Sequence, residues 1–418
     1  MEQIKYKLWT KNFSIITVGT LISMMGNAIS NFAISLVVLS QTNSTLLFSL
    51  YNILTTIPKI FVPMLVGPYV DRTSRKKLIV NIDLIYGFIF SLLTIIVYLE
   101  IYNFGLLLLF GVILGVLDSV YQVAYQSFYP ELISEGNFSK AYSISSLIYP
   151  IANTIMVPIA GFAYEYVGVT PLFLFNAVTF FITQGIERMI DSPETHLLSM
   201  EQKNDVSKVD KKEVFKKDFM EGVKYLKSER GLSSITGYFF VSMMLMGVSG
   251  TLLLPYFKSS PNLDVSQYSV LMACNTAGRM IGGALHYKFK YPTHLKFRIA
   301  LIVYCTISTI DGALLFMGYP AMLTCYLFYG MLSVTSYNIR TSGTQSYVDS
   351  VKRGRFNGLF MMITTAGQMI GQLVAGIMGE FIYIPYILVG FNIFNFLAAL
   401  LIMLRNKKQV SVIYNQQL

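Results

Sequence analysis

Charged residues are scarce in this sequence. Lysine, arginine, aspartate and glutamate together make up 13% of the 418 residues, whereas hydrophobic residues make up 54%. A soluble domain normally carries about a quarter charged residues. The mean hydropathy of +0.55 is also too high for a surface that faces water. This composition excludes a soluble globular chain, a disordered chain and a fibrous repeat, and it predicts a protein that is surrounded mostly by lipid.

Cysteine is rare and the common enzyme motifs are missing. Cys274, Cys305 and Cys325 each stand alone in an apolar stretch, so neither a disulfide framework nor a cysteine metal site is expected. The sequence has no glycine-rich phosphate loop ending in Lys-Ser/Thr, no Gly-x-Ser-x-Gly and no paired His-Glu metal signature. We therefore expect no ATP hydrolysis, no other enzymatic activity, no cofactor and no metal ion.

Long apolar windows are abundant instead. A helix needs roughly 20 apolar residues to cross about 30 Å of hydrocarbon. Apolar and polar residues do not alternate with a period of two, which argues against a lipid-facing barrel. We predict an all-α membrane protein with twelve transmembrane helices. The windows are 12–38, 45–66, 78–99, 104–126, 142–163, 169–186, 235–257, 266–285, 299–318, 320–339, 356–379 and 381–404. The charged residues inside them are Lys59, Asp83, Asp118, Arg279 and Asp311.

Basic residues outside the windows fall almost entirely on one side. Of the 32 lysines and arginines, 29 lie at the two ends of the chain or in alternate loops. Only Lys258 lies in an opposite loop, and Lys59 and Arg279 lie within windows. By the positive-inside rule, both termini of this multi-pass cell-membrane protein are expected in the cytoplasm. The net charge of +10 is then explained by basic residues that orient the chain in the membrane and attract anionic lipid headgroups. No nucleic-acid binding is expected.

The windows form two groups of six, separated by a polar, lysine-rich stretch. We predict an N-terminal six-helix bundle over 1–190, a cytoplasmic linker with an amphipathic helix over 191–231, and a C-terminal six-helix bundle over 232–418. The two bundles are expected to be pseudo-symmetric.

A short pattern recurs in the two groups. An Ala-Gly pair followed by a glutamate, Gly161 with Glu165, reappears as Gly376 with Glu380 in the corresponding window of the second group. Such six-helix repeats occur in transporters that bind substrate near the middle of the membrane, between the repeats.

The loop after the second window carries the most specific motif. It reads Gly67-Pro-Tyr-Val-Asp71-Arg72-Thr-Ser-Arg75-Lys76, which resembles the Gly-x-x-x-Asp-Arg-x-Gly-Arg-Arg/Lys signature of the major facilitator superfamily, with a serine at the second glycine position. The resemblance implies the two-bundle fold of these transporters over essentially the whole chain. It also implies a gating role for the motif, because a carboxylate beside several cations forms charge-assisted bonds that can break when the bundles move.

Three looser patterns, in residues 219–227, 254–256 and 352–358, resemble the macrolide-efflux and enterobactin-exporter-like branch of that superfamily. The resemblance implies a secondary active efflux transporter that is a monomer and acts by proton antiport on a small molecule. We expect an anionic or zwitterionic substrate such as a carboxylate siderophore. A macrolide or multidrug efflux pump is the alternative, and a lipid flippase on the same fold is a further one.

Charges inside the membrane suggest where the substrate binds. Each costs roughly 2.5–3.5 kcal/mol at the bilayer centre, so each is expected to have a partner or a function. Lys59 and Arg279 lie near the midpoints of corresponding windows and could face each other around an anion, with Asp118 as the proton-coupling group. Alternatively, Asp118 pairs with one of the bases as a structural tie. Asp83 is expected to pair with the basic loop beside it, and Asp311 has no assigned role.

Uncharged polar side chains on the expected cavity helices extend this site. Interhelical hydrogen bonds would explain any one of them, but together they predict a polar, wetted pocket. The predicted substrate-binding residues are Asn27, Asn31, Lys59, Asp118, Gln122, Asn153, Asn275, Arg279 and Gln368.

Overall fold

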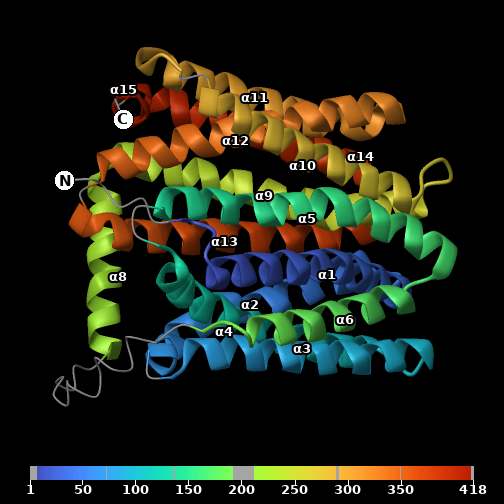
Figure 1. The fold of residues 1–418 in the computed structure, drawn as a ribbon. Helices are drawn as coiled ribbons and strands as arrows, with labels where there is room; N and C mark the ends of the chain where they lie inside the picture. Colours follow the sequence, from blue (N-terminus) through green and yellow to red (C-terminus); the bar gives the residue numbers. More distant parts are fainter. Residues whose placement is uncertain are drawn as a thin grey trace, which may run out of the picture. The chain divides into compact units, whose positions relative to one another are not determined.

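The computed structural model describes residues 7–71, 73–134, 137–191, 211–288, 291–348 and 350–415 (Figure 1). Within these ranges the chain forms helices joined by short connections, and no strand occurs there. The helices of the first half are α1 (Lys11–Thr42), α2 (Thr45–Asp71), α3 (Arg75–Tyr98), α4 (Phe104–Phe128), η1 (Tyr129–Leu132), α5 (Phe138–Val167) and α6 (Thr170–Glu187). Those of the second half are α8 (Lys211–Ser228), α9 (Arg230–Ser259), α10 (Val265–Lys288), η2 (Thr293–Leu295), α11 (Lys296–Ala313), η3 (Leu314–Phe316), α12 (Tyr319–Tyr347), α13 (Ser350–Phe381), α14 (Ile384–Ala398), η4 (Ala399–Leu404) and α15 (Lys407–Tyr414).

Polar capping residues explain where several helices begin. The side chains of Thr10, Ser74 and Asn103 each accept a hydrogen bond from the backbone N–H three residues later, at the starts of α1, α3 and α4. Such caps satisfy N–H groups that have no partner within the helix. α1 ends at Asn43, which takes the left-handed conformation with φ of 47° that closes many helices. The helices therefore extend beyond the apolar windows into their polar flanks.

Each predicted window coincides with a helix. Nine helical segments in the described part of the chain are long and apolar enough to cross a membrane. The helices α6, α10 and α12 are not among them, because polar residues interrupt their apolar sequences. The all-α membrane fold is confirmed, whereas the number of twelve crossings stays a prediction.

The chain divides into two compact units. Unit 1 comprises 1–43, 51–206 and 265–269, and unit 2 comprises 44–50, 207–264 and 270–418. Each unit therefore contains the first residues of a helix whose remainder belongs to the other unit. The predicted domain limits of 1–190, 191–231 and 232–418 remain a proposal.

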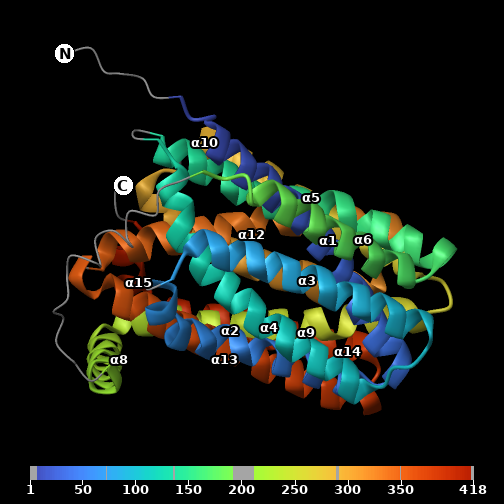
Figure 2. The same cartoon turned by 60° about the horizontal axis from the view of Figure 1, so that its bottom comes forward.

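Unit 1 is held together by α1 and α6. α6 packs against both α1 and α3, while α5 packs on α1 and α4 on α3 (Figures 1 and 2). Aromatic rings fill the contact between α3 and α6, where the ring centroids of Tyr86 and Phe180 lie 4.6 Å apart. This packing places the inward faces of α1 to α4 around the cavity described below.

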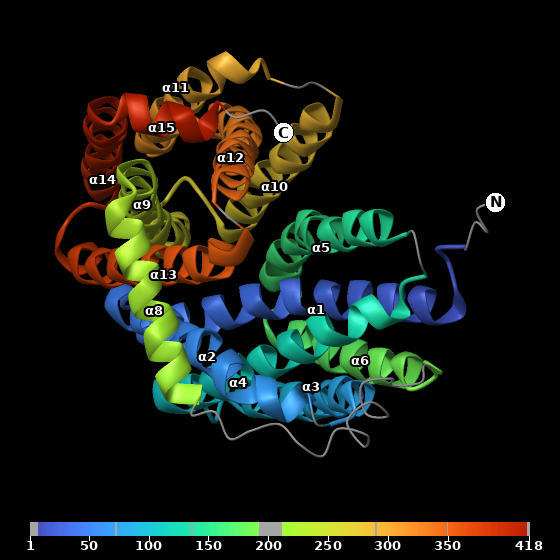
Figure 3. The same ribbon diagram turned by 90° about the vertical axis from the view of Figure 1, so that its left-hand side faces the viewer.

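Unit 2 has a core built by α9, α11, α14 and α15, with α12 beside α11 and α15 (Figure 3). Two buried phenols, Tyr304 on α11 and Tyr414 on α15, share a hydrogen bond of 2.9 Å. The helix α8 runs transverse to α9 and α13 (Figures 1 and 2). It occupies part of the stretch in which an amphipathic helix was predicted.

The first residues of α2 belong to unit 2 and those of α10 belong to unit 1, and in each case a glutamate of that unit binds them. In unit 2, Oε1 of Glu380 accepts hydrogen bonds from the Ser44 hydroxyl at 2.6 Å and the Leu46 N–H at 3.0 Å. In unit 1, Glu165 accepts from the N–H and the hydroxyl of Ser266, at 3.1 and 2.9 Å. Each carboxylate thus accepts hydrogen bonds from N–H groups that have no partner within the helix. Its negative charge also interacts favourably with the positive end of the helix dipole.

A glycine beside each carboxylate allows the close approach. A Cβ at Gly376 would lie 2.1 Å from Oγ of Ser49, and a Cβ at Gly161 would lie 2.1 Å from Oγ of Ser269. The recurring glycine–glutamate pattern of the sequence is therefore the signature of one packing contact built twice.

The contact predicts a position-specific effect of side-chain size. Gly376→Val should lower the stability of the protein by about 1–3 kcal/mol, because the new side chain overlaps Ser49. Gly358→Val is the matched control on the same helix, where a Cβ meets nothing within 4 Å. The measurement is thermal unfolding of both purified variants in detergent, and equal melting temperatures for the two would contradict the packing.

Candidate functional site

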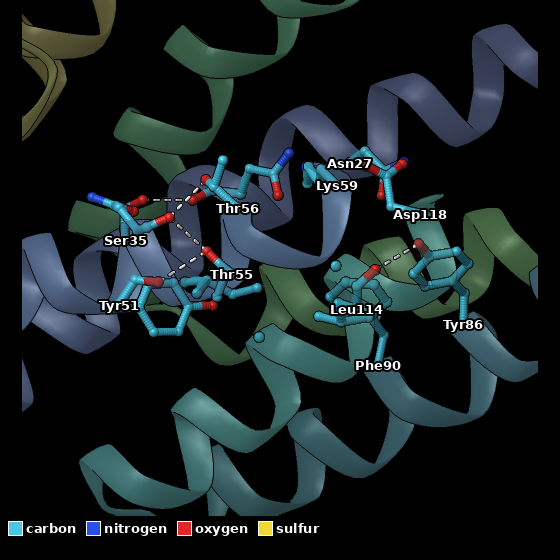
Figure 4. Close-up of a pocket in the computed structure, with 15 residues that line it drawn as sticks. Asn27, Ser35, Tyr51, Thr55, Thr56, Lys59, Tyr86, Phe90, Leu114 and Asp118 are labelled. Carbon is cyan, nitrogen blue, oxygen red and sulfur yellow. Dashed lines mark hydrogen bonds and ion pairs between the residues drawn. The ribbon is translucent and has the colours of Figure 1, made fainter. Parts of the chain in front are cut away.

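A polar cavity of about 280 Å³ lies inside unit 1, between α1, α2, α3 and α4 (Figure 4). Its lining combines amides, hydroxyls and one pair of charges with few apolar groups. The lining residues are Asn27, Asn31, Ile34, Ser35, Tyr51, Asn52, Thr55, Thr56, Lys59, Tyr86, Phe90, Gly111, Leu114, Gly115 and Asp118. Polar side chains that line an open hollow between apolar helices mark this cavity as the candidate site.

The charges in the cavity form an ion pair. Nζ of Lys59 on α2 lies 3.0 Å from Oδ2 of Asp118 on α4. The side chains are 52% and 34% exposed, so both remain accessible from the cavity. α2 and α4 can approach because a Cβ at Gly115 would lie only 2.6 Å from the Thr55 carbonyl oxygen. The close approach of the two backbones brings the ammonium and the carboxylate together.

Three amide side chains in the cavity are available to a ligand. Asn27, Asn31 and Asn52 form no side-chain hydrogen bond with the described residues, and an amide offers both donors and acceptors. The hydroxyls of Thr55 and Thr56 are different, because they donate to backbone carbonyls of their own helix. A bound molecule would therefore meet amides and an ion pair that can open.

Four of the predicted substrate-binding residues, Asn27, Asn31, Lys59 and Asp118, come together in this cavity. Gln122 lies one turn after Asp118 on α4 but is not part of the lining. Asn153 lies on α5, where its amide donates to the Tyr149 carbonyl at 3.0 Å. The structure therefore does not bring Gln122 and Asn153 to the cavity of unit 1.

The other predicted residues belong to unit 2. Asn275 and Arg279 lie on α10 and Gln368 lies on α13. The Arg279 side chain is exposed, has no ion-pair partner among the described residues, and interacts electrostatically with Tyr329 on α12. Because Lys59 belongs to unit 1, the predicted facing of Lys59 and Arg279 remains a prediction.

The ion pair changes the charge balance expected from the sequence. Lys59 and Asp118 compensate each other within the cavity, as the alternative structural interpretation anticipated. The cavity of unit 1 therefore carries no net charge, and excess positive charge at the predicted site rests on Arg279.

The basic residues of the gating motif contact the ends of other helices in unit 1. Arg75 forms an ion pair with Glu131 of η1, and its guanidinium also donates to the Ser127 carbonyl at 3.1 Å. Lys76 donates to the carbonyl of Ile190, just after α6. These contacts join the start of α3 to the ends of α4 and α6.

The other residues of the gating motif are Gly67, Asp71 and Arg72. Gly67 lies within α2. The Asp71 side chain and Arg72 lie outside the described residues, so their gating role remains a proposal.

Asp83 and Asp311 are both buried, but their surroundings differ. The expected ion pair of Asp83 with the basic loop does not occur among the described residues, and Asp83 instead interacts with the Glu187 side chain. Asp311 accepts hydrogen bonds from Ser249 at 2.7 Å, from Tyr326 at 3.0 Å and from the amide of Asn392 at 3.2 Å. Three donors from α9, α12 and α14 explain why Asp311 can be buried.

The comparisons with known proteins agree with this architecture. The profile of the Major Facilitator Superfamily matches residues 16–350. The chain therefore belongs to this superfamily of transporters, and it is a multi-pass membrane transporter rather than an enzyme.

Two relatives align almost end to end. Macrolide efflux protein A of Streptococcus pyogenes is 24% identical over 387 residues, which cover 90% of this chain and 91% of the relative. The uncharacterized MFS-type transporter YkuC of Bacillus subtilis is 24% identical over 405 residues, which cover 92% and 89%.

Solved structures support the fold. A bacterial homologue of the iron transporter ferroportin in an inward-facing state is similar with a TM-score of 0.68 and 16% identity, over 94% of this chain and 99% of that one. The nucleoside transporter NupG has a TM-score of 0.70 and 12% identity, over 95% and 100%. At such identities the likeness concerns the fold alone.

The exposed ion pair predicts a weak energetic coupling. In a double-mutant cycle with Lys59→Gln and Asp118→Asn, the coupling free energy should be about 0.5–1 kcal/mol, because water in the cavity screens both charges. Chemical unfolding of the four proteins in detergent measures it. A coupling near 3 kcal/mol or more would show that the pair is a dry structural tie instead.

The pair of Arg75 with Glu131 predicts the opposite behaviour. Its side chains are only 14% and 18% exposed, so Glu131→Gln leaves a buried guanidinium without its counter-charge and should cost about 3–5 kcal/mol. Lys77→Gln, at an exposed position two residues from Arg75, is the control and should change stability little. The same unfolding measurement applies, and similar stabilities of the two variants would contradict the assignment.

Proposed function

We propose that this transporter exports a small polar organic molecule that binds in part within the cavity of unit 1. The observation that carries the proposal is the accessible ion pair of Lys59 and Asp118 beside three available amides. Export is supported by the near full-length alignment with macrolide efflux protein A. Both termini are proposed to lie in the cytoplasm, as the distribution of basic residues predicts.

The cavity favours a substrate that carries both signs of charge or none. A zwitterion can replace the ion pair, because its anion can bind Lys59 while its cation binds Asp118. Asn27, Asn31 and Asn52 then provide hydrogen bonds to uncharged groups. Within the predicted range of anionic and zwitterionic molecules, the balance of charge in unit 1 thus favours the zwitterion. A carboxylate siderophore with a net negative charge would depend on Arg279 in addition.

A macrolide is the second candidate, on the strength of the relatives named macrolide efflux proteins. Macrolide antibiotics with an amino sugar are large, with one basic amine and many oxygen acceptors. Drug-sized ligands occupy pockets of about 300–1,000 Å³. The cavity of about 280 Å³ would therefore hold only the part of such a molecule that carries the amine, with Asp118 as the counter-ion.

Coupling to protons belongs to the same proposal. Protonation of Asp118 removes the negative charge that holds Lys59, and binding of a substrate cation to Asp118 competes with the proton. Substrate and proton would thus exclude each other from one carboxylate, which is the requirement for antiport.

The proposal predicts which variants lose transport. Uptake into everted membrane vesicles under an imposed pH gradient should be measured for a zwitterionic amino-acid derivative, a carboxylate siderophore and a macrolide. Asn27→Ala and the double variant Lys59→Gln/Asp118→Asn should each abolish most of the gradient-driven uptake of the transported compound. Lys227→Gln removes a charge from the exposed surface of α8 and should leave the uptake unchanged.

Two results would contradict the proposal. If uptake persists in Asn27→Ala and in the double variant, the cavity of unit 1 does not bind the substrate. If uptake is driven by a sodium gradient or by the membrane potential alone, Asp118 is not a proton-coupling group.

A further inference from the structure

A second acidic group lies in the interior of unit 1, outside the cavity. Asp83 on α3 and Glu187, the last residue of α6, are both 0% exposed. Their carboxyl groups are close enough to interact directly. Asp83 lies eight residues after the start of α3, which corresponds to about 12 Å along the helix axis. The pair is therefore enclosed by the helices rather than placed in a loop.

Neighbouring contacts fix the direction of the Glu187 side chain. A Cβ at Gly19 on α1 would lie 2.7 Å from Oε1 of Glu187, so the carboxyl group fills space against the backbone of α1. One turn before Glu187, the hydroxyl of Thr183 donates to the Gly19 carbonyl at 3.4 Å and holds α6 against α1. Although Glu187 ends its helix, its carboxyl group is directed into the contact of α1, α3 and α6.

The two carboxyl groups lack donors. None of their four oxygens has a hydrogen-bond partner in the part of the chain that the structure describes. The hydroxyl of Tyr121 on α4, a residue that is only 6% exposed, interacts electrostatically with both acids and is also without a partner among those residues. Two carboxyl groups that meet in the interior without any donor point to a missing proton, because a buried charge without a counter-charge is very costly.

Among the residues that the structure describes, the charged and titratable groups on the surrounding helices do not supply a counter-charge. α1 contributes Gly19, and its one titratable residue, Lys11, is exposed at the start of the helix. α4 contributes Tyr121 and Tyr125, and α3 contributes Tyr86. The bases near the same ends of the helices are occupied or exposed. Arg75 binds Glu131, Lys76 binds the Ile190 carbonyl, and Arg188 is exposed.

We propose that Asp83, Glu187 and Tyr121 form a proton-binding site in which the two carboxyl groups share one proton. Two carboxylates that are close enough to interact directly cannot both be ionised. One carboxyl group therefore keeps the proton and donates it to the other, which accepts. The Tyr121 hydroxyl lies near enough to interact electrostatically with both acids. In this form the site carries one negative charge, and uptake of a second proton from water yields two neutral carboxylic acids.

Tyr86 connects this site to the cavity. It lies one turn after Asp83 on α3, lines the cavity, and interacts electrostatically with both Asp83 and Asp118. Its hydroxyl donates to the Leu114 carbonyl at 3.2 Å, which fixes the ring between α3 and α4. A change of charge at Asp118 can therefore influence the proton affinity of Asp83 and Glu187 through the Tyr86 side chain. This role in coupling rests on the proposed function, whereas the shared proton does not.

Asp311 in unit 2 provides a matched comparison. It is also buried, at 2% exposure, but three donors satisfy its oxygens and no second acid among the described residues faces it. The two buried acidic sites thus differ in their hydrogen-bond donors. Asp311 has three donors and can stay ionised, whereas Asp83 and Glu187 have none and need a proton.

Infrared difference spectroscopy of the full chain in lipid, titrated over the neutral pH range, tests the site directly. The wild type should show a carboxylic-acid carbonyl band that titrates and shifts in heavy water. Asp83→Asn/Glu187→Gln should abolish this band, and Tyr121→Phe should shift it. Asp311→Asn should leave it unchanged. A melting curve of each variant in detergent establishes that it is folded.

Gradient-driven transport tests the coupling role. With the compound found to be transported above, Asp83→Asn/Glu187→Gln should lose uptake driven by the pH gradient and retain exchange of labelled for unlabelled compound. Exchange requires binding but no net proton movement, so its retention separates a coupling defect from a damaged cavity.

The outcomes are distinguishable. A titrating band that survives in the double variant overturns the proton site, whatever the substrate. A band that disappears while gradient-driven uptake stays at the wild-type level shows a structural acid pair and overturns the coupling role. If no compound is transported but the band behaves as expected, the proposed function fails and the proton site stands.

Discussion

An apolar interior in which an uncompensated charge is costly is the constraint on which the rest of the structure depends. Charges are compensated in different ways at different depths. Lys59 and Asp118 form an ion pair in the lining of the cavity, where both remain accessible. Asp311 is fully enclosed and is surrounded by hydrogen-bond donors from three helices. Because each arrangement fixes the rotation and depth of its helices, the few charges of the sequence determine much of the packing.

Most of the fold could be predicted from the sequence. Exclusion of charge from windows of membrane-spanning length locates the helices, since the hydrocarbon requires every backbone group to be satisfied within its own segment. The ends were less predictable. Thr10 and Ser74 start their helices by side-chain caps, which apolar windows do not reveal. The similarity of the two halves was visible in one short pattern, and its meaning became clear only when Glu165 and Glu380 were found at the starts of other helices.

The site was predicted in part, for physical reasons. Midplane charge and polar faces pointed to Lys59 on α2 and Asp118 on α4, and both line the cavity of unit 1. Whether two side chains meet depends on helix rotation and tilt, which one sequence does not specify. Gln122 is one turn from Asp118 and still does not line the cavity of unit 1. Glu187 was missed because the sixth window stopped one residue before it, so this acid was not counted among the charges inside the membrane.

The exchange of helix starts between the units affects how the protein is made. Val265–Ser269 belongs to unit 1 but is translated only after the polar stretch and α9, and Ser44–Leu50 belongs to unit 2 but is translated long before Glu380. While the chain emerges from the ribosome, Glu165 therefore has no Ser266 to bind, and the start of α2 has no carboxylate cap. The first half can therefore complete its contacts only after the start of α10 has been made, and the start of α2 gains its carboxylate only after α13 has been made.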